Sequence, residues 1–145
     1  MNIQTKYFGE IKINEEQMIT FSQGLPGFHD QKEFVLLDLP DNPLFQILQS
    51  VTEEYVAFIV VNPYHFRKDY EFDLDDSLLD LLQIESEKDV AVFSILSLKD
   101  PFETSTMNLQ APVIINAHKK LGKQYITNNK DCSTKEFIFT PVKEG

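Results

Sequence analysis

The residues of this sequence that could perform chemistry are few and lie far apart. The three histidines, His29, His65 and His118, fall in or beside expected turns, and no catalytic motif surrounds any of them. Nucleophilic catalysis needs a serine, cysteine or threonine held beside an activating base. Lone histidines in loops usually face solvent, so we expect no catalytic residue and no enzyme activity.

Metal and phosphate sites also need donors at fixed spacing. Acidic residues alternate from Asp69 to Asp75, but this run lacks the glycine and the distal glutamate of a calcium loop. Neither Cys-x-x-Cys nor His-Glu-x-x-His occurs, and no lysine follows the glycines of Gly24-Leu25-Pro26-Gly27 as it would in a phosphate-binding loop. We therefore expect no metal site and no cofactor.

Acidic residues instead indicate a surface for a basic partner. The net charge is −10, and residues 65–89 hold nine acidic residues against three basic ones. We name the densest group the acidic face: Asp69, Glu71, Asp73, Asp75 and Asp76. Such a face favours a basic protein and repels phosphate backbones and anionic lipid, although alternating acids also occur on solvated strands. We expect no direct binding to nucleic acid or membrane.

The sequence also contains a basic segment and a single cysteine. Residues 117–130 contain no acid but hold Lys119, Lys120, Lys123 and Lys130, so the surface should have two electrical poles. The single cysteine, Cys132, lies in a polar run and has no partner for a disulfide, so we expect it at the surface of a cytoplasmic protein. No signal sequence and no apolar run of about 18 residues is present.

Apolar residues mostly recur with the period of two that strands require. This pattern predicts strands at residues 6–13, 18–21, 34–39, 45–51, 56–61, 90–98, 105–109, 113–116, 124–127 and 136–140. The first two should form a hairpin, and residues 90–98 should be buried on both faces. The sequence therefore predicts a mainly β, single-domain antiparallel β-barrel-like fold, or a sandwich, over residues 1–145.

One segment has helical spacing instead. After Asp75 and Asp76, the residues Leu78, Leu81 and Leu82 recur at i, i+3 and i+4, behind an acidic first turn. We expect one short helix at about residues 76–83. Its leucine stripe should close an open end of the barrel, with a partner-binding groove as the alternative.

A second protein-binding surface is expected near two prolines. Phe102 and Met107, which we name the apolar edge, lie between Pro101 and Pro112 in a segment that resembles an edge strand. Exposed edges with apolar side chains allow another protein to add a strand. We expect Phe102 and Met107 to contact a partner and Leu109 to lie in the core.

Several short motifs follow one another from about Thr5 to Ile126: Thr5-Lys6-Tyr7-Phe8-Gly9, Gly24-Leu25-Pro26-Gly27-Phe28, Leu48-Gln49-Ser50, Ala57-Phe58, Asn62-Pro63, Thr106-Met107-Asn108-Leu109, Ala111-Pro112-Val113-Ile114-Ile115-Asn116 and Lys123-Gln124. Each motif is weak alone, but the Asn-Leu-x-Ala-Pro-Val-Ile-Ile-Asn run close behind the others is specific. In this order the motifs resemble the FliW family of flagellar assembly factors. The resemblance weakens after Asn128.

The resemblance implies a cytoplasmic, flagellin-binding chaperone that also antagonises CsrA, an RNA-binding translational repressor. Exchange between flagellin and CsrA would then couple flagellin synthesis to export, and we expect the acidic face to keep RNA away from bound CsrA by its charge. The free protein should be a monomer. Two alternatives stay open: an RNA-binding β-barrel, and a small-ligand or hydrolytic barrel with a concave polar pocket.

Overall fold

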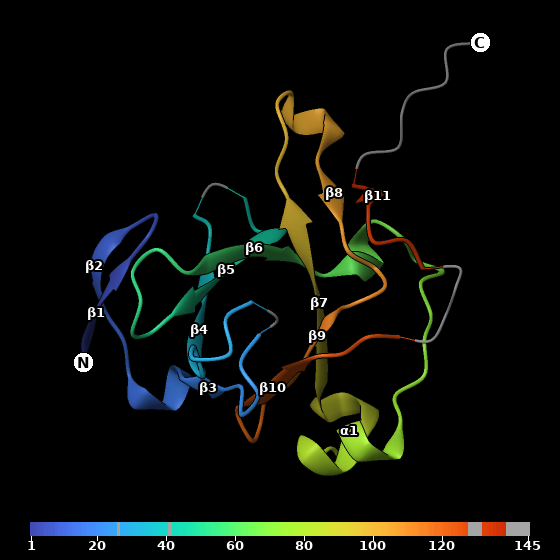
Figure 1. Ribbon diagram of the computed structural model, residues 1–145, viewed down its shortest axis with the longest axis horizontal. Coiled ribbons are helices and arrows are strands. Elements are labelled where there is room, and N and C mark those ends of the chain that lie inside the picture. Colours follow the sequence, from blue (N-terminus) through green and yellow to red (C-terminus); the bar gives the residue numbers. More distant parts are fainter. Residues whose placement is uncertain (26, 41, 128–131, 139–145) are drawn as a thin grey trace.

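The strands follow the predicted apolar runs over much of the chain. The computed structural model describes residues 1–25, 27–40, 42–127 and 132–138 (Figure 1). Its strands are β1 (Asn2–Thr5), β2 (Gly9–Lys12), β3 (Ile19–Thr20), β4 (Glu33–Asp38), β5 (Phe45–Ser50), β6 (Ala57–Val61), β7 (Val90–Ser97), β8 (Thr106–Met107), β9 (Val113–Asn116), β10 (Leu121–Gln124) and β11 (Glu136–Phe137). The helices are α1 (Asp76–Leu81) and the 3-10 turns η1 (Glu15–Gln17), η2 (Pro63–His65), η3 (Glu87–Asp89) and η4 (Phe102–Thr104).

Seven strands close into a mixed barrel, which confirms the predicted fold class. The order around the barrel is β3-β4-β5-β6-β7-β9-β10, and the last strand returns to β3. The pairing of β10 with β3 is parallel, at Leu121 and Thr20, whereas the other pairs in the ring are antiparallel. β8 and β11 extend the sheet beyond the end of β7, and β1 and β2 form a separate hairpin.

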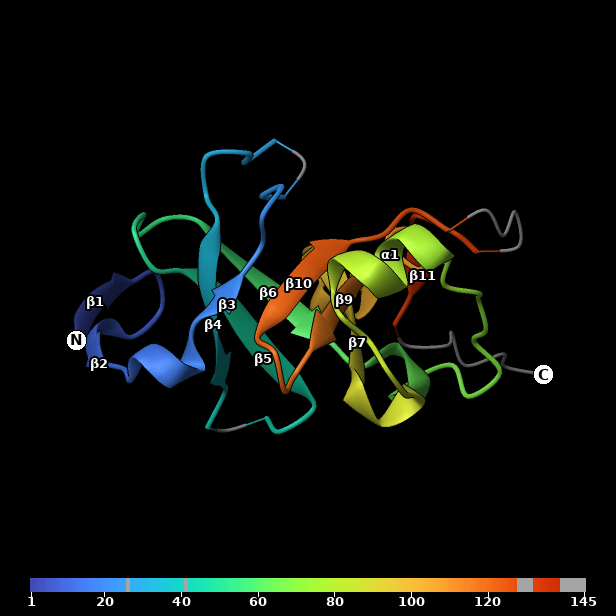
Figure 2. The same cartoon turned by 90° about the horizontal axis from the view of Figure 1, so that it is seen from below.

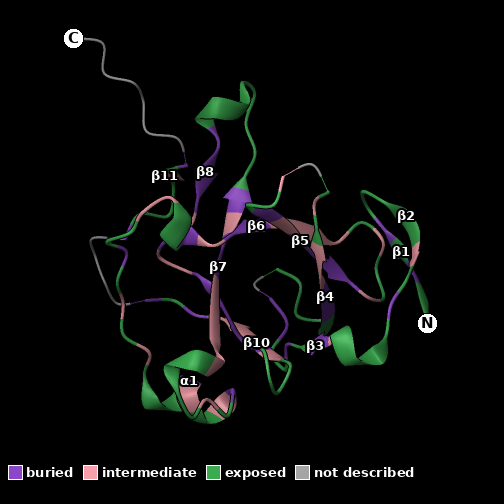
Figure 3. Cartoon of the chain, turned by 180° about the vertical axis from the view of Figure 1, so that it is seen from behind, coloured by how far each residue is buried: buried purple, intermediate pink, exposed green. Residues whose placement is uncertain are grey.

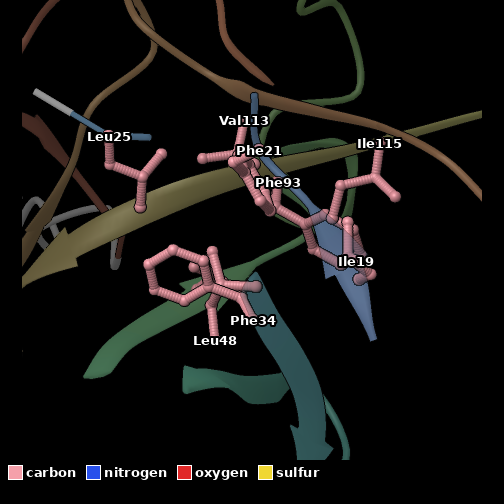
Figure 4. Close-up of a cluster of buried hydrophobic side chains, with 9 residues drawn as sticks. Ile19, Phe21, Leu25, Phe34, Leu48, Phe93, Val113 and Ile115 are labelled. Carbon is pink, nitrogen blue, oxygen red and sulfur yellow. The ribbon is translucent and has the colours of Figure 1, made fainter. Parts of the chain in front are cut away.

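Alternate residues of the barrel strands point inward and form its core (Figure 4). The buried members are Ile19, Phe21, Leu25, Phe34, Leu48, Val60, Phe93, Val113 and Ile115. The rings of Phe21 and Phe34 meet edge to face with centroids 5.3 Å apart. Such aromatic pairs stabilise a core by more than their buried area alone.

The outer faces of most barrel strands are covered by three more apolar clusters. The β1–β2 hairpin covers β4 with Ile3 and Ile13, and α1 covers β9. Residues that follow η2, together with β8, cover β5, β6 and β7. Ala91, Phe93 and Ile95 of β7 thus face the barrel core while Val90 and Val92 face outward clusters, which confirms the expected burial of β7 on both sides.

Two predicted strands are misplaced. Residues 6–8 form a turn, because the Thr5 hydroxyl accepts from Phe8 N at 2.9 Å and Gly9 adopts φ +68°, so β2 begins only at Gly9. Its partner is β1, not residues 18–21, which instead pair with β4 and β10. A strand was predicted at residues 124–127, but β10 already ends at Gln124.

Figure 2 shows the β1–β2 hairpin at one end of the molecule and α1 and β11 at the other.

The predicted helix is present but does not close the barrel end. Asp75 accepts from Leu78 N at 2.8 Å and caps α1, which ends at Leu81, two residues before the predicted end. Leu78 and Leu82 pack against Ile114 on the outer face of β9, whereas the neighbouring Val113 faces the core. α1 therefore covers the barrel wall.

None of the helices among the described residues has the length and apolar character needed to cross a membrane.

Candidate functional site

The acidic face lies on an extended segment between η2 and α1. Along residues 69–75 the odd positions, Asp69, Glu71, Asp73 and Asp75, are exposed. The even positions, Tyr70, Phe72 and Leu74, turn toward the barrel and are buried or half-buried. Asp76 extends the exposed set into the first turn of α1. The structure thus brings together all five residues of the predicted acidic face, and Figure 3 shows that exposed residues are concentrated in such connecting segments.

An aromatic row beneath the acidic face holds the segment in place. The rings of Tyr64 and Tyr70 have centroids 5.4 Å apart, Tyr70 and Phe72 are 5.2 Å apart, and Phe72 and Tyr125 are 6.4 Å apart. The Tyr70 hydroxyl donates to Leu109 O at 2.5 Å. Burial raises the pKa of Tyr70 well above its usual value, with smaller contributions from Cys132 and Tyr64. The backbone that carries the exposed carboxylates is therefore held in place by packed aromatic side chains.

Asp75 has two partners and connects the segment to the barrel. One carboxylate oxygen, Oδ1, accepts from Leu78 N as the cap of α1. The other, Oδ2, lies 3.5 Å from the Tyr125 hydroxyl. That distance is long compared with the usual 2.7–2.8 Å, so the second contact is weak. Burial raises the pKa of Tyr125, and the negative charge of Asp75 raises it further.

Three cavities flank the acidic segment. One of about 480 Å³ is lined by Glu71, Phe72, Asp73, Leu74, Asp75, Tyr125 and Thr127, and we name it the Tyr125 cavity. A second of about 360 Å³ is lined by Arg67, Asp69, Tyr70, Glu71, Leu109, Cys132 and Glu136. A third of about 440 Å³ is lined by Tyr64, Phe72, Asp73, Leu74, Glu87, Val90 and Val92. Each of the three cavities is therefore bordered by at least one residue of the acidic face.

An arginine of the chain itself occupies one side of this surface. Arg67 Nε donates to Glu136 Oε1 at 2.9 Å, Nη1 donates to Phe66 O at 2.7 Å, and Nη2 donates to Phe137 O. These bonds tie η2 to β11. The guanidinium directs three of its donors to three separate oxygen acceptors, and Arg67 lines the second cavity together with Asp69, Tyr70 and Glu71.

The predicted apolar edge is wrong for one of its two residues. Phe102, in η4, is 43% exposed and touches Phe45 edge to face with centroids 6.0 Å apart. Met107 is only 1% exposed, because β8 lies between β7 and β11 and is not an edge. Leu109 is buried, as predicted. The surface part of the apolar edge is therefore Phe102.

The histidines and the cysteine lie apart from one another. His29 contacts Gln23 O at 3.3 Å through Nδ1, and His118 Nε2 lies 3.5 Å from Asp89 Oδ1. Cys132 is buried in the cluster of Tyr70 and Leu109, so the expected surface position is wrong. Within the described ranges, no three histidine, cysteine or acidic side chains are grouped in a way that could hold a metal ion.

Two residues of the Tyr125 cavity were missed by sequence reasoning. Tyr125 and Thr127 were assigned to a short edge strand, whereas they follow β10 and lie against the acidic segment. Their alternation with the exposed Ile126 was the available signal. The predicted basic pole is separate: Lys119 and Lys120 are exposed on the turn between β9 and β10, Lys123 lies in β10, and Lys130 is outside the described residues.

Comparison with known proteins identifies close relatives over the full length. Residues 2–138 match the family model described as FliW protein. The chain is 47% identical to the flagellar assembly factor FliW of Oceanobacillus iheyensis, over 100% of this chain and 99% of the relative. It is 50% identical to that of Geobacillus thermodenitrificans, over 96% of each chain. A crystal structure of the flagellar assembly factor FliW superposes with a TM-score of 0.94 at 46% identity, over 99% of this chain and 100% of that chain.

Proposed function

This chain belongs to the FliW family of flagellar assembly factors, and from that membership we propose that it binds newly made flagellin and, alternatively, the translational repressor CsrA. Flagellar assembly factors of this family are not enzymes. Exchange between the two partners couples flagellin synthesis to export. It takes place in the cytoplasm, and the free protein is a monomer.

The observation that carries the CsrA proposal is the outward carboxylate row on a packed aromatic base. A repressor that grips RNA must present lysine and arginine to phosphate. Five exposed carboxylates within eight positions of one segment provide the complementary sign. Because the buried Tyr70 and the half-buried Phe72 alternate with them, little ordering of the segment is needed when a basic surface binds.

Charge also explains how binding acts on RNA. A body of net charge −10 beside the RNA-binding surface of CsrA lowers the attraction of that surface for phosphate without covering every base contact. We propose electrostatic exclusion, with a coupling free energy of about 1–3 kcal/mol, as is typical of linked sites. The protein itself binds no nucleic acid, since its acidic face has the sign of the phosphate backbone.

A salt series tests this assignment. We expect the double variant Asp69→Lys and Asp73→Lys to bind CsrA at least tenfold more weakly at low salt, with a shallower dependence of affinity on salt concentration. Asp75 is left intact because it caps α1. The matched control reverses the exposed Glu15 and Glu16, which lie in η1 and change the net charge equally.

The control separates local contact from overall charge. If both double variants lost CsrA affinity equally, the acidic face would contribute only through the net charge of the protein and not through local contact. Unchanged affinity and unchanged salt slope in Asp69→Lys with Asp73→Lys would remove the acidic face from the interaction. Calorimetric titration of each variant with purified CsrA at three salt concentrations gives both quantities.

Phe102 is proposed as a separate partner contact. Its exposed ring lies on η4, at the tip of the connection between β7 and β8, and leans on Phe45. Exposed aromatic rings on a fixed base commonly anchor protein interfaces. We expect Phe102→Ala to weaken binding of flagellin or CsrA by about tenfold or more, whereas Tyr55→Ala, on the connection between β5 and β6, should change neither. Unaltered affinity for both partners would contradict this role.

A further inference from the structure

We propose that the Tyr125 cavity is a receptor for one arginine side chain of the basic partner. This inference rests on the proposed function, because it names the residue type that the acidic face anchors. The cavity holds about 480 Å³, and exposed carboxylates from Glu71, Asp73 and Asp75 border it. Its volume admits a long cationic side chain, and its charge favours one.

A buried hydroxyl provides evidence that is independent of the carboxylates. Thr127 lines the cavity and is 3% exposed, and its Oγ1 has no hydrogen-bond partner among the described residues. A buried hydroxyl without a partner is unfavourable, and native proteins rarely leave one without a reason. Rotation about χ1 moves Oγ1 to another staggered position, so the hydroxyl, which is covered in this structure, can turn toward a donor that enters the cavity.

The carboxylates also have acceptor capacity left. Asp75 is held by its cap to Leu78 N, so its position is fixed, while Oδ2 makes only the long contact to the Tyr125 hydroxyl. Asp73 makes no hydrogen bond or ion pair within the described part of the chain. A donor in the cavity would therefore find two oxygen acceptors, Asp75 Oδ2 and the Asp73 carboxylate, and rotation of Thr127 about χ1 would add Oγ1 as a third.

The walls favour arginine over lysine. The rings of Phe72 and Tyr125 both line the cavity, with centroids 6.4 Å apart and planes inclined by 33°. A guanidinium stacks on aromatic faces and directs five N–H donors to separate acceptors, whereas an ammonium is a compact and strongly hydrated charge. Arg67, which lines the neighbouring cavity, shows the same use of separate donors, since its Nε, Nη1 and Nη2 each bond a different oxygen.

A small probe tests the site directly on the full chain. N-acetyl-arginine methylamide is titrated into isotope-labelled protein and compared with its lysine and citrulline counterparts, citrulline being the uncharged isostere of arginine. We expect the arginine probe to shift the backbone amide signals of residues 71–75 and 125–127, lysine to bind at least threefold more weakly, and citrulline not to bind. Equal shifts with arginine and citrulline would overturn the proposal.

Thr127→Val is the decisive variant because it keeps the side-chain shape and removes the hydroxyl. We expect this variant to bind both the arginine probe and CsrA about 3- to 10-fold more weakly. The dependence of CsrA affinity on salt concentration should stay unchanged, because no charge is lost. The melting temperature should stay equal or rise, since the hydroxyl has no partner to lose. Asp80→Asn, an exposed acid of α1 outside the cavity, should leave the arginine probe affinity unchanged.

The two proposals fail in different ways. If Asp69→Lys with Asp73→Lys weakens CsrA binding while Thr127→Val changes neither CsrA nor probe affinity, the arginine receptor is wrong and the acidic face stands. If neither variant affects CsrA binding, both proposals are wrong. Weaker binding in both variants, with the salt slope altered only by the charge reversal, supports both.

Discussion

Gly122 in β10 occupies a position where the barrel has no room for a side chain. A Cβ placed there would lie 2.6 Å from Cζ of Phe21, whose ring is fully buried against Phe34. Gly122→Ala should therefore lower the free energy of unfolding by about 1–3 kcal/mol through overpacking. Denaturant unfolding measures this change.

A double-mutant cycle shows whether the ring is the cause. In a Phe21→Leu background the smaller side chain leaves space, so Gly122→Ala should be less destabilising than in the parent protein. Gly9→Ala is the control for backbone strain alone, because Gly9 has φ +68° but a Cβ there meets nothing within 4 Å. An identical effect of Gly122→Ala in both backgrounds would contradict the packing explanation.

Tyr70 should make stability depend on alkaline pH. Burial raises the pKa of its hydroxyl above the unfolded value of 10.0, so the folded state favours the protonated form. The resulting stabilisation is fully present below pH 10 and is lost as pH rises from there toward the folded-state pKa. Tyr70→Phe should be about 1–2 kcal/mol less stable at pH 8, because Leu109 O loses its donor.

The pH dependence separates titration from packing. Above pH 10 the difference between Tyr70→Phe and the parent should narrow, because the parent alone loses the contribution of Tyr70. Denaturation curves at pH 8, 10 and 11 measure it, with Tyr55→Phe, whose ring is exposed, as the control. A difference that stays constant with pH would contradict the role of the Tyr70 proton.

Residue-level prediction succeeded where a single extended segment determined which side chains are exposed. The acidic face was correctly grouped, because extended backbone alternates its side chains and places all odd positions of residues 69–75 on one side. Met107 and Cys132 were misassigned to the surface. Both are buried by elements distant in sequence, β11 over Met107 and the Tyr70 cluster around Cys132, and no local pattern encodes such coverage.

Among the elements, β11 depends on one side chain outside its own sheet. It pairs with β8 through two residues only, and Arg67 bonds both its Glu136 side chain and the backbone of Phe137. Arg67→Lys keeps the charge but cannot reach these acceptors together. Amide exchange at residues 136–138 should become about tenfold faster, which corresponds to about 1.4 kcal/mol of local opening.

Amide exchange in the barrel strands provides the internal control for this measurement. Amides of β5 and β6, which pair over five residues in the barrel, should exchange at unchanged rates. Faster exchange throughout the molecule would mean that Arg67 stabilises the whole fold and not the β11 segment in particular.

The longer strands were predicted closely, and the four-residue β9 was predicted with its observed bounds. β4, β5, β6 and β7 each have five or more residues, and their apolar runs predicted them to within about two residues. β2 was misplaced because the turn that ends at Gly9 sets its first residue. β10 was misplaced because its pairing with both β9 and β3 sets its bounds. α1 was found from its leucine spacing, but the surface it covers depends on which face of β9 is outward, and that follows only from closure of the barrel.

Closure is a property of the whole molecule that the sequence pattern left open. Alternating strands suit a barrel and a sandwich equally, and the choice is made where β10 meets β3 in parallel at a single residue pair. Closure gives β5, β6, β7 and β9 an inner and an outer apolar face, and the outer faces are what the segment of the acidic face, β8 and α1 cover. The proposed partner-binding surface thus lies on the segments that cover the barrel and not in its interior.

Charge placed across this whole surface should govern how fast a basic partner arrives. Lys119 and Lys120 are exposed on the turn between β9 and β10, outside the acidic face, and without their two positive charges the net charge would be more negative than −10. Lys119→Glu with Lys120→Glu should raise the association rate with CsrA about two- to fivefold at low salt and leave the dissociation rate unchanged, because long-range attraction acts on encounter. Stopped-flow measurements should show this gain disappear at high salt. A slower dissociation with an unaltered association rate would instead place these lysines inside the interface.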